Sequence, residues 1–232
     1  MRIVTWNCNG AFRHKFERIA ALGADVAVIQ ECEDPALSSA AYRNWAGAYA
    51  WAGSTKSKGI GVFVKPGLRV KPLGWEDHGF QQFLPVRIGR MTMLAVWTQQ
   101  AAASNMSYIG QFWHYWRHHA VRFSRSSILC GDFNSNSNSI WDRPRRAWNH
   151  GECVAVLGRA GFQSLYHAAS GEAQGRETRP TFYLHRNLEK PYHLDYIFAH
   201  RRALPPDWRG LSVGDPREWL DASDHMPLIA EF

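Results

Sequence analysis

Polar residues that can bind a metal ion or move a proton lie at the ends of several strand-like runs in this sequence. Carboxylate and amide oxygens are the ligands that Mg²⁺ prefers, and imidazole changes its charge readily near neutral pH. A hard cation beside such groups suits hydrolysis of a phosphate ester, in which negative charge builds up on the phosphate oxygens. The residues with this placement are Asn7, Glu31, Asp132, Asn134, Asp195, Asp224 and His225.

Asp195 is the most informative of these residues because it lies inside an apolar run, close to Leu194 and Ile197. A carboxylate within such a strand is unfavourable unless it is paired or bound to a metal, although a buried hydrogen bond to the backbone is an alternative. For Glu31 the alternative is a solvated strand end, and for Asp132 it is a turn cap. Each alternative is plausible alone, but their combination is much less so.

The apolar patterning indicates which elements carry these side chains. Residues 2–6 and 25–29 are β-prone, and residues 12–20 between them share one apolar helical face. This predicts a strand-helix-strand unit with parallel strands, so we expect Asn7 and Glu31 to leave the same edge of a sheet. Further strands are expected at residues 59–64, 91–98, 127–130, 181–184, 193–199 and 228–232, and helices at 108–123 and 152–159.

Five segments, taken in order along the chain, resemble the endonuclease/exonuclease/phosphatase superfamily. They are Thr5-Trp6-Asn7, Gln30-Glu31, Gly131-Asp132-Phe133-Asn134, Leu194-Asp195-Tyr196 and Ser223-Asp224-His225. The segments 180–183 and 191–198 are similar to those of small bacterial-type members. The resemblance implies an α/β (α+β) fold, a four-layer sandwich of two mixed β-sheets packed face to face with helices on the outer faces. It also implies Mg²⁺, or Mn²⁺, as the cofactor.

The resemblance also implies how a metal ion would be held. Glu31 is expected to be the first ligand, with Asn7 and Asp224 completing or supporting the shell around the ion. One or two carboxylates suffice for Mg²⁺, because this ion keeps several of its own water molecules.

The remaining motif residues are expected to act on the substrate and the attacking water. Asp132 would orient or deprotonate that water, and Asn134 would donate a hydrogen bond to a phosphate oxygen, with Asn7 close by. Asp195 would orient the imidazole of His225. The resemblance leaves open whether His225 is a general base or a protonated group that stabilises phosphate charge.

Substrate contacts are expected from residues around this centre. Trp97 stands where many relatives have a tyrosine or histidine near the phosphate, and an indole cannot release a proton at useful pH, so protonation of the leaving group would fall to water. Asn136 or Asn138 is expected to supply a second amide. Basic residues that could reach a phosphate backbone are Arg143, Arg145 and Arg146, with Lys56 and Lys58 as similar candidates and solvated basic loops as the alternative.

Composition favours an anionic partner. The chain has 232 residues, and its 27 Lys and Arg against 20 Asp and Glu give a net charge of +7. Nucleic acid, an inositol phosphate or an anionic membrane surface would suit that charge equally. We expect one domain over residues 1–232, a cytoplasmic protein with reduced cysteines, no membrane span and no obligate protein partner.

Three functional hypotheses follow. The leading one is a metal-dependent phosphodiesterase that cleaves DNA as an endonuclease or exonuclease, at nicks, ends or abasic sites. The alternative is a phosphatase or phosphodiesterase acting on inositol phosphates, phospholipid head groups or small nucleotides. The third is a catalytically impaired relative that binds nucleic acid, against which the retention of every acidic position argues.

Overall fold

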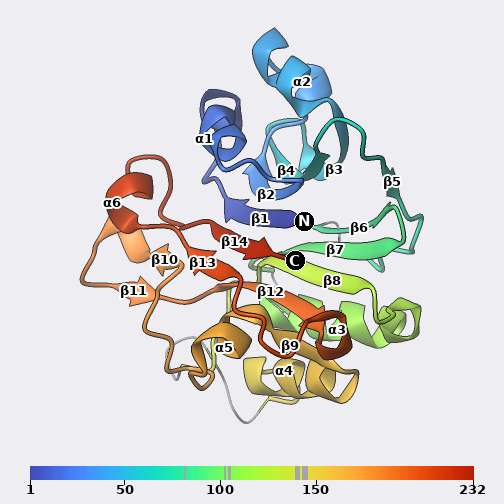
Figure 1. The fold of residues 1–232 in the computed structure, drawn as a ribbon, viewed down its shortest axis with the longest axis vertical. Helices are drawn as coiled ribbons and strands as arrows, with labels where there is room; N and C mark the ends of the chain where they lie inside the picture. The colour runs from blue at the N-terminus through green and yellow to red at the C-terminus, as the bar shows by residue number, and fades with distance from the viewer. Residues whose placement is uncertain (81, 102, 104–105, 139–141, 143–145) are drawn as a thin grey trace.

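The structure, a computed structural model, describes residues 1–80, 82–101, 103, 106–138, 142 and 146–232. Two β-sheets stack face to face, and helices lie on the outer side of each sheet (Figure 1). This arrangement confirms the predicted four-layer sandwich of two mixed sheets. The two chain termini meet in the first sheet, where the amide of Phe232 donates to the carbonyl of Met1 at 2.8 Å.

The first sheet has six strands in the order β13-β14-β1-β2-β4-β3. β1 and β2 run parallel, as predicted, and the other neighbouring strands in this sheet are antiparallel. Asn7 lies opposite Gln30, so Asn7 and Glu31 leave the same edge of the sheet. The strands are β1 (Arg2–Asn7), β2 (Val26–Cys32), β3 (Ala48–Thr55), β4 (Lys58–Val64), β13 (Leu211–Val213) and β14 (Leu228–Glu231).

The second sheet has six strands in the order β5-β6-β7-β8-β12-β9. Only β7 and β8 run parallel, and this register sets Asp132 beside Trp97. The strands are β5 (Val70–Pro72), β6 (Phe83–Ile88), β7 (Met91–Trp97), β8 (Ser127–Asp132), β9 (Phe162–Ser164) and β12 (Asp195–His200). A separate hairpin pairs β10 (Phe182–Tyr183) with β11 (Pro191–Tyr192).

The central strands are apolar on both faces because both faces are covered. In β2, Val26 and Val28 belong to the core between the sheets, whereas Ala27 and Ile29 belong to the core under the outer helices. Each fully buried valine or isoleucine contributes ~1.5–3 kcal/mol of transfer free energy, so this continuous apolar run stabilises the sandwich. The helices are α1 (Phe16–Ala21), α2 (Ala40–Ala46), α3 (Ile109–His119), α4 (His150–Arg159), α5 (Leu165–Ser170) and α6 (Pro216–Trp219). None of the helices in the described residues is long and apolar enough to cross a bilayer.

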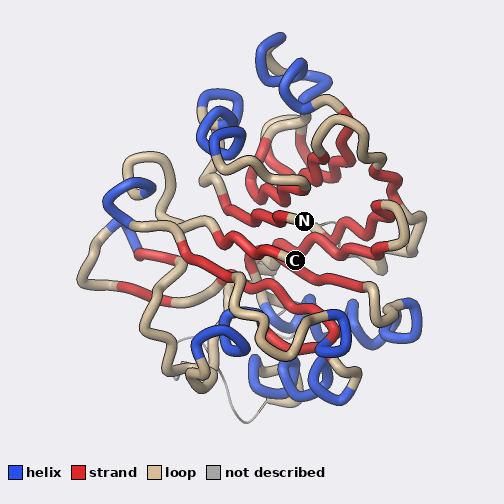
Figure 2. The backbone as a smooth tube through the Cα atoms, in the orientation of Figure 1, coloured by secondary structure: helices blue, strands red, loops and turns tan. Residues whose placement is uncertain are grey.

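Some predicted elements differ in length or were missed, as the alternation of helix, strand and loop along the tube shows (Figure 2). The helix expected over 12–20 is broken at Lys15, whose φ of −129° separates a short 3-10 turn from α1. Of the helix expected over 108–123, the α-helical part ends at His119, and a 3-10 turn over Ala120–Arg122 follows it. The two missed long strands are β3, which contains three alanines and a glycine, and β6, which contains Pro85. These residue types are unfavourable in strands, so pairing with neighbouring strands overrides local propensity at these positions.

Candidate active site

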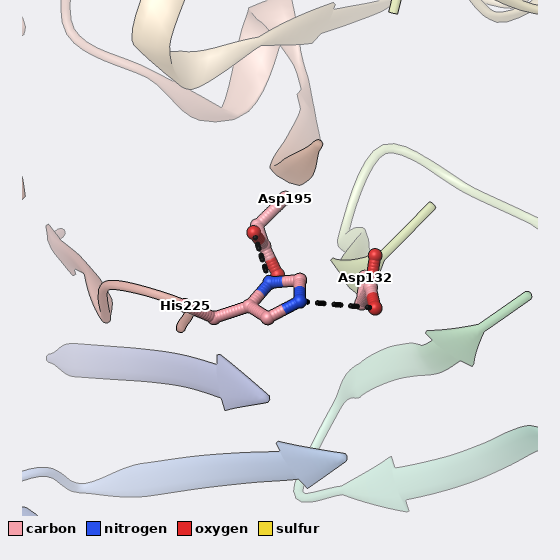
Figure 3. A group of neighbouring side chains, drawn as sticks. All are labelled: Asp132, Asp195 and His225. Carbon is pink, nitrogen blue, oxygen red and sulfur yellow. Dashed lines mark hydrogen bonds and ion pairs between the residues drawn. The ribbon is translucent and has the colours of Figure 1, made fainter. Parts of the chain in front are cut away.

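The predicted polar residues gather where β8 ends and β12 begins, beside the carboxyl end of β1. Asp132 is the last residue of β8 and the register partner of Asp195, the first residue of β12. His225 comes from the loop before β14, and its ring lies between the two carboxylates (Figure 3). In the described part of the chain, these three form the group that could ligate an ion, with ligand atoms all within 4.8 Å of one another.

Asp195 and His225 form a buried pair. The Nδ1 atom of His225 donates to Oδ2 of Asp195 at 2.9 Å, and the two side chains are 6% and 1% exposed. The indole of Trp6 donates to the His225 carbonyl at 2.8 Å, and the Phe182 ring packs against the imidazole with centroids 4.6 Å apart. These contacts hold the imidazole so that Nε2 faces Oδ2 of Asp132 at 4.0 Å. This is the geometry that an orienting role for Asp195 requires.

Asp132 is fully buried and is held by two asparagines. Its Oδ2 accepts from the Nδ2 atoms of Asn7 at 2.9 Å and Asn134 at 2.8 Å, while its Oδ1 accepts from the backbone amide of Asn134 at 2.8 Å. The Nδ2 atom of Asn134 also donates to the carbonyl of Thr98 at 2.9 Å. Both amides therefore orient the Asp132 carboxylate, and donation from Asn134 to a phosphate stays a prediction.

Two backbone features place these side chains. Gly131 has a φ of 143°, and a Cβ atom there would lie 1.9 Å from the Val96 carbonyl oxygen, so only glycine permits the close approach of β7 and β8 before Asp132. In β2, a shift in register between Gln30 and Cys32 isolates Glu31, whose φ is 63°. Such a bulge redirects a side chain out of the strand alternation, which is a common device beside functional sites.

Glu31 lies at the rim of this group. Its Oε1 accepts from Nδ2 of Asn7 at 3.2 Å, and its Oε2 forms an ion pair with Nζ of Lys58 at 2.7 Å. The Lys58 ammonium also lies over the Trp97 ring, 5.9 Å from the centroid. Glu31 is therefore connected to Asp132 through Asn7, and Lys58 occupies the open side of its carboxylate.

Ser223 and Thr181 support the site, although both lie in motif segments to which no such role was assigned. The hydroxyl of Ser223 donates to the Asn7 carbonyl at 2.7 Å and accepts from the His225 amide at 3.0 Å, which ties the last loop to the end of β1. The hydroxyl of Thr181 accepts from the Asp195 amide at 3.0 Å. Their position inside the motif strings was the only signal in the sequence.

Burial and neighbouring charge shift the protonation of the central groups. Burial raises the pKa of the Asp132 carboxyl to about 7; the charge of His225 opposes this rise and that of Asp195 adds to it. For His225, burial alone would lower the pKa, but the charges of Asp195 and Asp132, with a smaller contribution from Asp224, raise it to about 10. A raised pKa favours the imidazolium form of the ring, and with it the protonated stabiliser of the two roles left open by the sequence.

We expect a ¹⁵N NMR titration of the protein in EDTA to show both ring nitrogens of His225 protonated at pH 7, with loss of one proton only as pH approaches about 10. The pKa of His225 in the folded protein lies above its value of about 6.5 in the unfolded chain. The charge of His225 therefore stabilises the fold fully below pH ~6.5, and this stabilisation is lost as pH rises through the pKa of the folded state. A neutral ring at pH 7 would contradict this expectation.

The donor set fits a divalent cation. No donor in the described residues satisfies Oδ1 of Asp195, although this atom is buried, and a bound cation or water could supply the missing partner. The nearby oxygens of Asp132 and Glu31 are hard ligands of the kind that Mg²⁺ or Mn²⁺ selects. Of the predicted ligands, Glu31 faces Lys58, and Oδ1 of Asn7 accepts from the Asn9 amide at 3.0 Å. The set Glu31, Asp224 and Asn7 stays a prediction.

Lys58→Met is expected to strengthen Mn²⁺ binding by about 1.4-fold to fivefold, because the ammonium of Lys58 competes with a cation for the Glu31 carboxylate. A partly exposed ion pair is worth ~0.2–1 kcal/mol, which corresponds to this range. Titration calorimetry with Mn²⁺ measures the change. Lys65→Met, which removes an equivalent ion pair with Asp25 elsewhere, should leave Mn²⁺ affinity unchanged. Weaker binding in Lys58→Met would contradict the competition.

The predicted substrate-binding residues have different environments. Trp97 is 4% exposed and belongs to the core between the sheets, and the Lys58 ammonium lies over its ring. Asn138 is half-buried in the loop after β8. Arg146 lies over the Trp148 ring at 5.6 Å. Arg143 and Arg145 lie outside the described residues. Phosphate contacts by these residues stay predictions.

Asn136, the other candidate for a second amide, lies in a buried polar network and is 3% exposed. Its Nδ2 atom is 3.0 Å from each of three acceptors, on Glu177, the His193 carbonyl and the Tyr196 hydroxyl. Burial alone would raise the pKa of Glu177, but hydrogen bonds from His167, the Gly175 amide and Asn136 outweigh it and hold this pKa at about 2. The network anchors the loop that follows Asp132 and Asn134.

Asn136→Ala is accordingly expected to lower the free energy of unfolding by ~1–3 kcal/mol, because it leaves buried acceptors without their donor. Urea unfolding at pH 7 measures this loss. Asn44→Ala, an exposed position in α2, serves as the control and should change stability by less than ~0.5 kcal/mol. An Asn136→Ala variant as stable as the wild type would show that the network does not anchor the loop.

The comparisons with known proteins agree with this fold. The model of the Endonuclease/Exonuclease/phosphatase family matches residues 4–225, and the chain belongs to this family. Members of the family are hydrolases of phosphate esters and generally use divalent metal ions. No curated protein sequence matches the chain significantly.

Several solved structures share the fold along their whole length. An AP endonuclease from Archaeoglobus fulgidus is 18% identical with a TM-score of 0.71, and the match covers 100% of this chain and 99% of that one. The 3'-5' exonuclease NExo from Neisseria meningitidis is 17% identical with a TM-score of 0.73 and the same coverage, 100% and 99%. TDP2 from D. rerio, complexed with a single-strand DNA product, is 17% identical with a TM-score of 0.61, covering 99% and 97%.

Proposed function

We propose that this protein is a metal-dependent phosphodiesterase that hydrolyses phosphodiester bonds in DNA. The observation that carries the proposal is the buried group of Asp132, Asp195 and His225, joined through Asn7 to Glu31. An imidazolium, a carboxylate with a raised pKa and an adjacent acidic rim are the groups that in-line attack of water on a phosphate requires.

Each residue then has a distinct task. Asp132, held by Asn7 and Asn134, accepts the proton of the attacking water, since a base with a pKa near 7 works best near neutral pH. His225, held by Asp195, presents a protonated Nε2 to the phosphate oxygens and stabilises their charge. Glu31, with the carboxylates beside it, would hold Mg²⁺ or Mn²⁺, which supplies further neutralisation of the developing negative charge when bound.

DNA is preferred as the substrate for two reasons. The net charge of +7 favours a polyanion, because each phosphate contact by lysine or arginine releases condensed counterions. The structural neighbours named above include an AP endonuclease, a 3'-5' exonuclease and a protein bound to single-strand DNA product. A cytoplasmic location would be compatible with this role.

One assay tests the proposal. The protein is incubated with Mg²⁺ or Mn²⁺ and plasmid, abasic duplex, single-stranded oligonucleotide or a panel of phosphomonoesters that includes inositol phosphates. DNA cleavage that disappears in EDTA and in the His225→Ala and Glu31→Gln variants is the expected result. Activity surviving in both variants would contradict the site, and activity confined to phosphomonoesters would favour the phosphatase alternative. Binding of DNA without hydrolysis of any substrate would indicate an impaired relative.

A further inference from the structure

A pocket of about 350 Å³ lies next to the candidate active site and takes no part in the proposed chemistry. One wall comes from the segment after β1, which contributes Arg13, and another from the turn between β3 and β4, which contributes Lys56. Leu37 and Ser38, from the segment after β2, also line the pocket. Two of these segments follow β1 and β2, the strands that carry Asn7 and Glu31, and the third is the turn before Lys58.

The pocket and the active site share the turn between β3 and β4. Lys56 lines the pocket, whereas Lys58, two residues later, pairs with Glu31 at 2.7 Å. The Asp34 amide donates to the Lys56 carbonyl at 2.9 Å and fixes the turn to the segment after β2. Glu31 in the site and Glu33 in the pocket wall are two residues apart, so their Cα atoms are separated by at most about 7 Å. This separation is close to the distance between neighbouring phosphates in an extended nucleic acid strand.

The lining has the chemistry of a nucleotide site. Lys56 is exposed, and Arg13 neutralises the Glu33 carboxylate by an ion pair. The Ser38 hydroxyl oxygen is shielded from solvent, yet no partner for it lies within the described residues. Leu37 is 67% exposed beside these polar groups. A cation and a hydroxyl match a phosphate, and an exposed leucine matches the apolar face of a sugar or base.

We infer that this pocket binds the phosphate adjacent to the scissile one in a nucleic acid strand, with Lys56 and Ser38 as its main contacts. The inference rests on the proposed function and deepens it, because it makes the protein select a polymer over an isolated phosphate ester. Lys58 then lies between two neighbouring phosphates, one in the active site and one in the pocket.

The test compares two substrates that differ in whether a neighbouring phosphate exists. One is a single-stranded oligonucleotide, and the other is bis(4-nitrophenyl) phosphate, a diester with a single phosphate. Lys56→Glu is expected to lower kcat/KM for the oligonucleotide about tenfold and to leave kcat/KM for the small diester unchanged. Ser38→Ala should give a smaller loss with the same selectivity. Lys71→Glu, an exposed lysine on the edge strand β5, is the charge-matched control.

Oligonucleotide binding measured by fluorescence anisotropy in EDTA tests the pocket without any cleavage. Lys56→Ala should reduce the slope of log Kd against log salt concentration by about 0.7, the value for one lost contact to a single strand. An unchanged slope, or an equal loss of activity on both substrates in Lys56→Glu, would overturn the inference. If the wild type cleaves neither substrate, the proposed function fails, whereas the slope still decides whether the pocket binds a strand.

Discussion

His225→Gln is expected to lower kcat/KM for phosphodiester hydrolysis by about a thousandfold. The variant removes an imidazolium that is buried between two carboxylates and faces Asp132 at 4.0 Å. Loss of a preorganised charged donor, or of a positioned proton carrier, typically costs ~10²–10⁴ in rate, because no water in a buried site can replace it. Steady-state hydrolysis of an oligonucleotide at saturating Mn²⁺ measures the effect.

Glutamine is preferred over alanine for this measurement because it retains a polar group beside Asp195. His118→Ala, on the exposed face of α3, is the control and should retain full activity. The near-ultraviolet circular dichroism of both variants should match that of the wild type. A His225→Gln enzyme within tenfold of the wild type would remove this residue from the mechanism.

Asp195→Asn is expected to lower kcat by about a hundredfold to a thousandfold while the protein remains folded. Oδ2 of Asp195 accepts from His225, and Oδ1 has no donor among the described residues, so an amide can replace the carboxylate without displacing an internal hydrogen bond. The substitution removes the charge that does most to raise the pKa of His225. That pKa should fall, and the activity that depends on the imidazolium should be lost at lower pH than in the wild type.

The pH profile separates positioning of the imidazole from simple damage to the fold, because a merely structural defect would lower activity without moving the alkaline limb. The double variant Asp195→Asn with His225→Gln should be no less active than His225→Gln alone, since Asp195 acts through the imidazole. If the loss of activity in the double variant equalled the product of the two single losses, this dependence would be contradicted. Asp215→Asn, a partly exposed carboxylate paired with Arg217, is the matched control and should have wild-type activity.

Much of the fold could be predicted because the central strands carry a local signal. The β-branched run in β2 and the apolar run in β7 are long enough to be recognised without neighbours, and the helical segment between β1 and β2 favoured a parallel pair. β3 and β6 lack this signal. Their alanine, glycine and proline residues become part of strands only because neighbouring strands supply the hydrogen bonds.

The contacts within the site followed less directly from the sequence. Lys58 was one of several basic candidates, and nothing local showed that its ammonium would pair with Glu31 and lie over Trp97. Asn136 was one of two candidates, with Asn138, for a second amide in the site, and the fold directs its amide toward a buried carboxylate and Tyr196. Partners of this kind are distant in sequence, so the choice among them depends on how the two sheets pack.

The sequence by itself determined the types of the chemical groups and the family to which they belong, because motif residues and apolar periodicity are properties of short segments. The tertiary structure decided the protonation of His225, the support of Asp132 by Asn7 and Asn134, and the pocket at Lys56. Charge state depends on burial and on the distances to other charges. Those quantities exist only once the ends of β1, β8 and β12 have been brought to one edge of the folded sandwich.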